Sequence, residues 1–173
     1  MPSSQPHDNH SGQAVLRDWS PADGSWYIAQ LGDPDIQRFT SERADTTVDD
    51  FTAALGELRQ CDDLAGFAII DSATGELAGN LAAARSDDTA VIHYWIAPSS
   101  RGRGVATEAV RQMCRWIAAN WSCGELRLDI YADNEASQRV AEKAGFHHQP
   151  DRDHLEEHTQ RAWRVYIRSG RDN

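Results

Sequence analysis

The order of hydrophobic and polar positions along the chain predicts a mixed α/β domain. Apolar side chains at helical spacing predict helices over 21–31, 47–58, 105–121 and 136–144. Runs rich in β-branched and other apolar residues predict strands over 14–19, 64–70, 77–84, 90–97 and 126–131, with two more beginning at Phe146 and over 161–167. The run 90–97 is almost wholly apolar, which is typical of a central strand buried on both faces.

Glycine, proline and polar caps set the expected ends of these elements. Gly32-Asp33-Pro34 is expected to stop the first helix, and Gly124 to end the helix at 105–121. Asp133 or Asn134 is expected to cap the last helix, which Gly145 terminates.

Length and charge narrow the class of protein. The 173 residues suit one domain, expected over 14–168, between a flexible tail at 1–13 and a short tail at 169–173. A formal charge of −10 argues against nucleic acid and membrane partners and suits a cationic substrate such as an amine. No apolar run approaches the ~20 residues of a membrane span, and the start of the chain lacks a leader signature. Three cysteines without C-x-x-C spacing predict reduced thiols and a cytoplasmic protein.

The segment 96–106 (IAPSSRGRGVA) carries the main chemical signal. A buried strand ends, glycines permit a tight turn, and a helix begins at once, so unpaired backbone N–H groups converge on one point. An anion fits there, with Arg101 and Arg103 adding charge at the rim. The chain lacks G-x-x-x-x-G-K-[ST], and Thr107 replaces the third glycine of a dinucleotide fingerprint. An ordinary glycine turn before an amphipathic helix is the alternative at this point.

A separate pattern, H-x-x-E-H at 154–158, matches the inverted zinc-protease motif. On a helix it would bring the imidazoles of His154 and His158 one turn apart and give a zinc hydrolase. The nearby Pro150 indicates a loop, and no remote third ligand is evident. The zinc hydrolase is therefore the remote alternative, and no metal is expected.

Two motifs in order resemble those of the GNAT acetyltransferase superfamily. Arg101-Gly102-Arg103-Gly104-Val105-Ala106 is similar to the family's [Q/R]-x-x-G-x-[G/A] loop. Asn134-Glu135-Ala136-Ser137, followed by the segment 139–146 (RVAEKAGF), resembles the second motif of the RimJ/RimL-like branch. The start of the chain at 15–23 and the pair Tyr94-Trp95 are also similar to that branch.

The resemblance implies a GNAT fold, with a mixed central sheet of about six to seven strands, splayed middle strands and about four flanking helices. It also implies acetyl-CoA as the cosubstrate. By the resemblance, the cofactor contacts are the backbone of Trp95, Ile96 and Ala97 for the pantetheine arm, the loop residues Arg101, Gly102, Arg103, Gly104, Val105, Ala106 and Thr107 for the pyrophosphate, and Asn134 and Ser137 beside the arm.

The resemblance also implies roles in the reaction. Ser137 matches the serine that gives a proton to the departing thiolate, and the Ile96 N–H is the expected donor to the thioester oxygen. Two positions depart from the family: Val91 stands where a glutamate is frequent, and Ala141 where a tyrosine is frequent.

The general base is the least determined role. His93 shares a strand face with Val91, and a histidine can titrate near neutral pH, so His93 is the candidate base. The alternative is a histidine that only packs within the strand and has no catalytic role. A water relay to Asp153, Glu156 or Glu157 and attack by an amine that is already deprotonated stay open.

Together these features predict an acetyl-CoA-dependent N-acetyltransferase acting on a primary amine, either a protein N-terminus or a small cationic molecule. The departures at Val91 and Ala141 make a non-catalytic acyl-CoA-binding sensor of the same fold the main alternative. The sequence leaves open whether the protein is a monomer or a homodimer.

Overall fold

The computed structural model describes residues 13–171, so the tail expected at 1–13 lies outside the described residues except for Gln13. Of the tail expected at 169–173, Ser169 ends the last strand and residues 172–173 lie outside the described range. Within that range eight strands form one sheet in the order β1-β2-β3-β4-β5-β8-β6, and β7 also pairs with β8. The strands are β1 (Ala14–Asp18), β2 (Leu64–Asp71), β3 (Leu77–Ser86), β4 (Thr89–Ile96), β5 (Glu125–Tyr131), β6 (His147–His148), β7 (His154–Leu155) and β8 (Ala162–Ser169).

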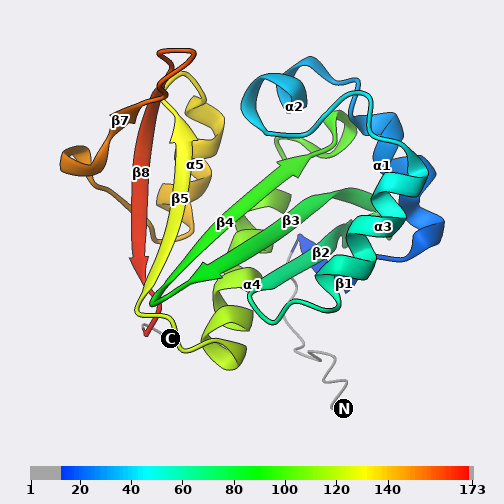
Figure 1. The fold of residues 1–173 in the computed structure, drawn as a ribbon, viewed down its shortest axis with the longest axis horizontal. Helices are drawn as coiled ribbons and strands as arrows, with labels where there is room; N and C mark the ends of the chain where they lie inside the picture. Colours follow the sequence, from blue (N-terminus) through cyan, green and yellow to red (C-terminus); the bar gives the residue numbers. More distant parts are fainter. Residues whose placement is uncertain (1–12, 172–173) are drawn as a thin grey trace.

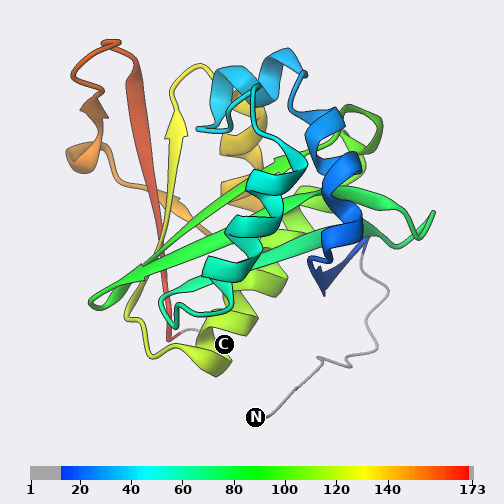
Figure 2. The same cartoon turned by 45° about the vertical axis from the view of Figure 1, so that its right-hand side comes forward.

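Helices cover both faces of this sheet. They are α1 (Gly24–Gln30), α2 (Pro34–Phe39), α3 (Val48–Leu58), α4 (Val105–Asn120) and α5 (Glu135–Lys143), with short 3₁₀ turns η1 (Pro21–Asp23), η2 (Pro98–Ser100) and η3 (Pro150–Arg152). Figure 2 shows α1 and α3 in front of the sheet and α4 behind it. The structure confirms the mixed α/β fold that the sequence predicts.

The side chains of β4 alternate between two hydrophobic cores. Ala90, Ile92 and Ile96 pack into the larger core, which the sheet forms with α4 and α5. Trp95 points to the other face and packs into a smaller, aromatic core with residues of α1 and α3. This two-sided burial is the reason the segment reads as an almost continuous apolar run.

The middle of the sheet is splayed, as the sequence resemblance implies. β4 and β5 form the sheet's parallel pair, but they are in register only from Thr89 to Val91 against Glu125 to Arg127. Beyond Val91, β4 continues to pair with β3 as far as Ile96, while β5 continues to pair with β8. The two strands therefore diverge toward their carboxyl ends and leave a V-shaped gap between them (Figure 1).

The predicted stop of the first helix is confirmed but a second helix follows it directly, and the predicted end of the helix at 105–121 is wrong. Asp33 and Pro34 do end α1, but they also begin α2: the Asp33 carboxylate accepts hydrogen bonds from the backbone of Asp35 and Ile36, and Pro34 occupies the first turn. Gly124 does not cap α4, which ends at Asn120. Instead, its N–H donates to the Asp88 backbone at 2.9 Å, and a side chain at Gly124 would overlap the Asp88 carboxylate.

Two further predictions are that the cysteines are reduced and that the chain has no membrane-spanning segment. Cys61, Cys114 and Cys123 are free thiols. Among the helices of residues 13–171, none has the length and apolar character needed to cross a bilayer.

Candidate active site

The backbone of β4 offers hydrogen-bonding groups to the gap. The Ala97 N–H donates to Ala78 O at 2.8 Å, so Ala97 and, by the alternation of an antiparallel pair, Trp95 direct their polar groups toward β3. The N–H groups of Tyr94 and Ile96 face the opposite way, where β5 has already diverged. Of the three expected partners of the pantetheine arm, Ile96 is the one whose N–H faces the gap.

The loop between β4 and α4 forms an anion cradle at the end of this gap. Gly102 and Gly104 have φ values of +75° and +77°, a conformation that side chains disfavour. The helix has no side-chain cap. Within residues 13–171, the backbone N–H groups from Gly102 to Thr107 donate to no other group, whereas the Arg101 N–H is used by Pro98 O. The cradle therefore offers several free donors at the positive end of α4.

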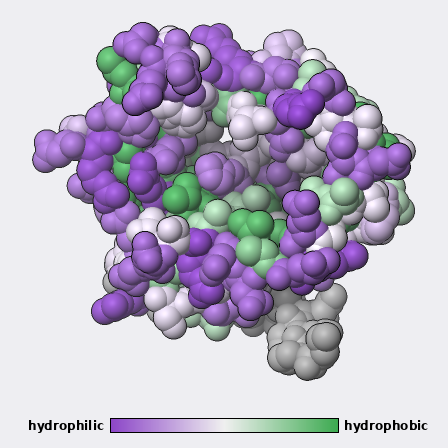
Figure 3. Space-filling model, in the orientation of Figure 1, coloured by the Kyte–Doolittle hydropathy of each residue, from purple (hydrophilic) through white to green (hydrophobic). Residues whose placement is uncertain are grey.

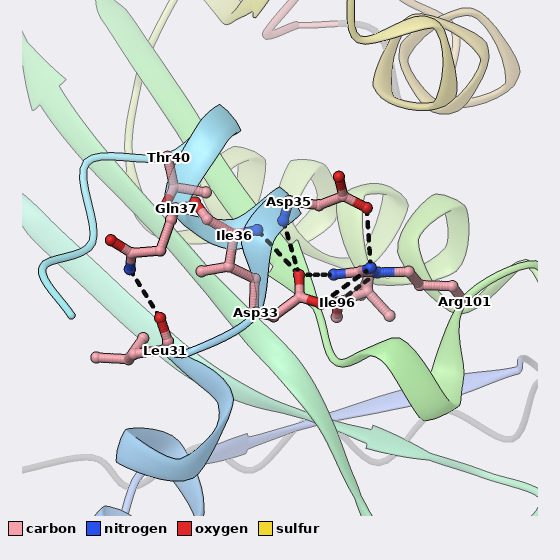
Figure 4. Close-up of polar contacts among 8 residues, drawn as sticks. All are labelled: Leu31, Asp33, Asp35, Ile36, Gln37, Thr40, Ile96 and Arg101. Atoms are coloured by element: carbon pink, nitrogen blue, oxygen red, sulfur yellow. Dashed lines mark hydrogen bonds and ion pairs between the residues drawn. The ribbon is translucent and has the colours of Figure 1, made fainter.

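The two arginines of the loop are held by carboxylates and do not point freely at the cradle. Arg103 lies 2.6 Å from a carboxylate oxygen of the buried Asp71. Arg101 contacts Asp33 at 2.5 Å and Asp35 at 3.1 Å, and its Nε donates to Ile96 O at 3.1 Å (Figure 4). These ion pairs offset the arginine charges, so the backbone N–H groups are the principal donors to an anion.

The contact between Arg101 and Asp33 ties the cradle to α2. Asp33 caps α2 and binds Arg101 with the same carboxylate, as the dashed lines of Figure 4 show. Desolvation acts to raise the pKa of Asp33, but the hydrogen bond from Arg101 and the backbone N–H groups outweigh it and lower that pKa below its usual range. The carboxylate is therefore ionised at neutral pH. No pattern in the sequence indicated this contact, because a helix over Pro34–Phe39 was not predicted.

On the α5 side of the sheet, three polar side chains meet near the gap. Asn134 caps α5 by accepting a hydrogen bond from the Ser137 N–H at 3.1 Å, as predicted. Its Nδ2 group donates to nothing within the described residues, so it is available to a ligand. The Tyr94 hydroxyl donates to Ser137 Oγ at 3.0 Å, which joins β4 to α5. Burial raises the pKa of Tyr94 to about 12 and keeps the hydroxyl protonated.

His93 lies on the opposite face of β4 and is exposed. Desolvation by the surrounding protein lowers the pKa of His93 below its usual value, while the negative charge of Asp129 on β5 opposes that shift. The imidazole is therefore largely neutral at pH 7 and able to accept a proton.

The other candidate bases are differently placed. Asp153 accepts one hydrogen bond from the Val165 N–H and contacts His148 at 2.9 Å, so its carboxylate holds the η3 turn to β8. Glu156 contacts the Thr159 hydroxyl within its own turn, and Glu157 is exposed. The local contacts of Asp153 and Glu156 favour structural roles.

Residues 38–42 cross the open end of the gap on the His93 face. Arg38 pairs with Asp133, just beyond β5, at 2.7 Å, and the Phe39 ring lies 6.3 Å from that of Tyr131 on β5. Glu42, four residues after Arg38, accepts a hydrogen bond from Trp95 Nε1 of β4 at 2.9 Å. Figure 3, drawn in the orientation of Figure 1, shows a hollow near the centre of this face of the molecule.

The zinc-protease pattern does not form the arrangement it requires. His154 and Leu155 form the short strand β7, and residues 157–159 form a turn, so His154 and His158 do not lie one turn apart on a helix. Within residues 13–171, no group of three His, Cys, Asp or Glu side chains gathers in a way that could hold a metal ion. The zinc-hydrolase alternative therefore loses its geometric basis.

The splayed parallel pair, the glycine cradle and the capped helix α5 define an acyltransferase of the GNAT type. The family model described as an acetyltransferase (GNAT) domain matches residues 13–147. Because this match covers most of the chain, the chain belongs to the GNAT acetyltransferase family. Comparison with curated protein sequences gives no match.

Solved structures share the fold at low sequence identity. The spermidine N-acetyltransferase from Vibrio cholerae, in complex with CoA and spermine, is 16% identical with a TM-score of 0.78, covering 91% of this chain and 96% of its own. RimL, a ribosomal L7/L12 alpha-N-protein acetyltransferase in complex with CoA, is 17% identical with a TM-score of 0.79, covering 94% and 97%. Mycobacterium smegmatis RimJ, in complex with CoA-disulfide, is 18% identical with a TM-score of 0.77, covering 91% and 82%.

Proposed function

We propose that this chain transfers the acetyl group of acetyl-CoA directly to a primary amine. The observation that carries the proposal is the position of the β4–β5 gap, which opens beside the free N–H groups at the start of α4. A pyrophosphate suits that cradle, because the backbone donors and the helix dipole both favour negative charge. The free Ile96 N–H and Asn134 Nδ2 suit the amide groups of a pantetheine arm in the gap.

The chemistry follows from the two faces of the gap. The amine nitrogen attacks the thioester carbonyl carbon, the C–N bond forms, the C–S bond breaks, and the amine loses a proton. His93, with its lowered pKa, accepts that proton on one face. Ser137, on the other face, gives a proton to the departing thiolate, and the Ile96 N–H stabilises the charge that develops on the carbonyl oxygen.

Tyr94 acts as a positioning residue for Ser137. Its hydroxyl donates to Ser137 Oγ, so the serine is left with its own proton to donate elsewhere. Burial holds Tyr94 in its protonated form throughout the neutral range, so its hydroxyl keeps the proton that it donates to Ser137 Oγ. Ser137 is thereby oriented as a donor before a ligand binds.

The similarity to other members of the fold supports an amine as acceptor. The similar structures include an enzyme named for spermidine and one named for the alpha-amino group of a ribosomal protein. Both names denote transfer to a primary or terminal amine. The net charge of −10 favours a cationic acceptor for this chain as well.

Two measurements test the proposal. Calorimetric titration with acetyl-CoA and with CoA should give saturable one-to-one binding. Release of free thiol from acetyl-CoA is then followed in the presence of a panel of diamines, monoamines and peptides with free N-termini. Binding together with amine-dependent thiol release supports the transferase, and absence of acetyl-CoA binding at millimolar concentration contradicts it.

A second candidate function is an acyl-CoA sensor without turnover. It is favoured by Val91 and Ala141, which replace a glutamate and a tyrosine frequent in similar sequences. Saturable acetyl-CoA binding without thiol release for any amine in the panel would favour the sensor over the transferase.

A further inference from the structure

Glu42 is a carboxylate held firmly in place beside the gap. Its backbone is fixed on both sides, because its N–H donates to Thr40 Oγ1 at 3.1 Å and its carbonyl accepts from Gln37 Nε2 at 3.2 Å. Its Oε1 atom accepts two further hydrogen bonds, from the Tyr27 hydroxyl at 2.5 Å and from Trp95 Nε1 at 2.9 Å. Two hydrogen bonds therefore fix the backbone of Glu42 and two fix its side chain, although the residue lies in no helix or strand.

The second carboxylate oxygen of Glu42 is open. Oε2 has no hydrogen-bond partner within the described residues, and the Glu42 side chain is only partly buried. The charge is backed by aromatic rings: Trp26 stacks against Trp95 at 6.0 Å, and Tyr27 meets Trp95 edge-on at 5.2 Å. A carboxylate on an aromatic wall is a suitable environment for an ammonium group.

Neighbouring charges are already paired, whereas Glu42 is not. Arg38 and Arg161 both bind Asp133, and Arg127 binds Asp129. Glu42 forms no ion pair with any cation of the described residues. Among residues 38–42, Glu42 therefore carries the charge that a cationic ligand can still neutralise.

The position of Glu42 relates it to an acceptor in the gap. Trp95, which holds Glu42, is two residues from His93 on the same face of β4. The nitrogen that attacks a thioester must be unprotonated, so a cation bound to Glu42 is a second amino group of the acceptor. We infer that Glu42 is a specificity-determining residue that binds the second, positively charged amino group of an aliphatic diamine through Oε2.

This inference rests on the proposed function and makes the acceptor class more specific. It is tested by titrating the CoA-bound protein with 1,4-diaminobutane and with 1-aminobutane, which have the same carbon chain but differ by one charge. We expect the wild-type protein to bind the diamine about tenfold more tightly than the monoamine. In Glu42→Gln, which keeps an acceptor for Tyr27 and Trp95, the two affinities should become equal within about threefold.

The matched control is Glu57→Gln, on the exposed face of α3, which changes the net charge equally and should keep the preference. Glu42→Asp should retain part of the preference for the diamine over the monoamine. Equal binding of the two amines by the wild-type protein overturns the inference, as does a preference that survives in Glu42→Gln or an equal loss of both affinities.

A structural measurement needs no substitution. Crystals of the CoA complex grown with 1,4-diaminobutane should place one amino nitrogen within hydrogen-bonding distance of Glu42 Oε2, and a diamine bound elsewhere overturns the inference. Failure of acetyl-CoA itself to bind would instead count against the proposed function. The two failures are therefore distinguishable.

Discussion

The Tyr94 hydroxyl and Ser137 Oγ, 43 residues apart in the sequence, are joined by a hydrogen bond of 3.0 Å that connects β4 with α5. The bond lies where β4 and β5 have separated, so it links the two sides of the gap at the level of the thioester in the proposed reaction. It also gives Ser137 a fixed donor partner, which the pattern of the sequence did not reveal.

Replacement of Ser137 tests its role as the acid. Ser137→Ala should lower kcat by about a hundredfold, because the departing thiolate loses its proton donor. Affinity for acetyl-CoA should stay within about twofold, since the Asn134 cap accepts from the Ser137 backbone and not from its hydroxyl. Tyr94→Phe should give a smaller loss of kcat, of about tenfold. An unchanged kcat in Ser137→Ala, measured by thiol release, would remove the serine from this role.

The cradle can be tested with two substitutions that impose equal backbone strain. Gly104 and Gly75 have φ values of +77° and +75°, so the backbone strain of Gly104→Asp and of Gly75→Asp should each lower stability by about 1 kcal/mol. A side chain at Gly104 would also displace the flexible side chain of Gln13, whereas the space at Gly75 is open. Gly75 lies in the turn between β2 and β3, away from the cradle. Only Gly104→Asp should weaken CoA binding strongly, by more than tenfold in calorimetry, because it adds a negative charge beside the free N–H groups. Equal affinities in the two variants would contradict this position of the pyrophosphate.

The pH dependence of transfer should report the protonation of His93. Its pKa is lowered by desolvation, so the imidazole stays neutral to a pH below its usual 6.5 and accepts protons throughout the neutral range. After correction for ionisation of the amine, kcat/KM should be constant near pH 7 and fall with decreasing pH only below 6.5.

The substitution His93→Gln should remove this acidic limb and lower the plateau by at least about tenfold. His147→Gln, on the exposed edge strand β6, is the control and should leave the profile unchanged. A profile that keeps its acidic limb in His93→Gln would assign the titration to another group.

The pair between Arg101 and Asp33 predicts an effect on cofactor affinity that depends on salt. Asp33→Asn keeps an N-cap for α2 but removes one negative charge next to the cradle. CoA should therefore bind about threefold more tightly at low ionic strength, and this gain should vanish in about 1 M salt. Asp49→Asn, exposed at the start of α3, is the matched control. Weaker CoA binding in Asp33→Asn would show that the pair orders the loop and does not offset its charge.

The local elements followed from the sequence because their determinants are local. The apolar run of β4, the glycines of the cradle and the Asn134 cap each depend on residues within a few positions of one another. The two motifs, which lie in the right order, also identified the family. The helix α2 was missed because Asp33-Pro34 acts as both a stop signal and a start signal, and only packing decided that a second helix follows.

The tertiary structure decided which side chains meet across the gap. Arg101 with Asp33, Tyr94 with Ser137 and Glu42 with Trp95 are pairs distant in sequence. Their contacts depend on where β4 leaves β5 and on how residues 38–42 cross the open end, and both are set by strand register and packing of the whole sheet. The sequence determined the elements, the cradle and the family, whereas the surroundings of the reacting groups arose from long-range packing that residue spacing does not encode.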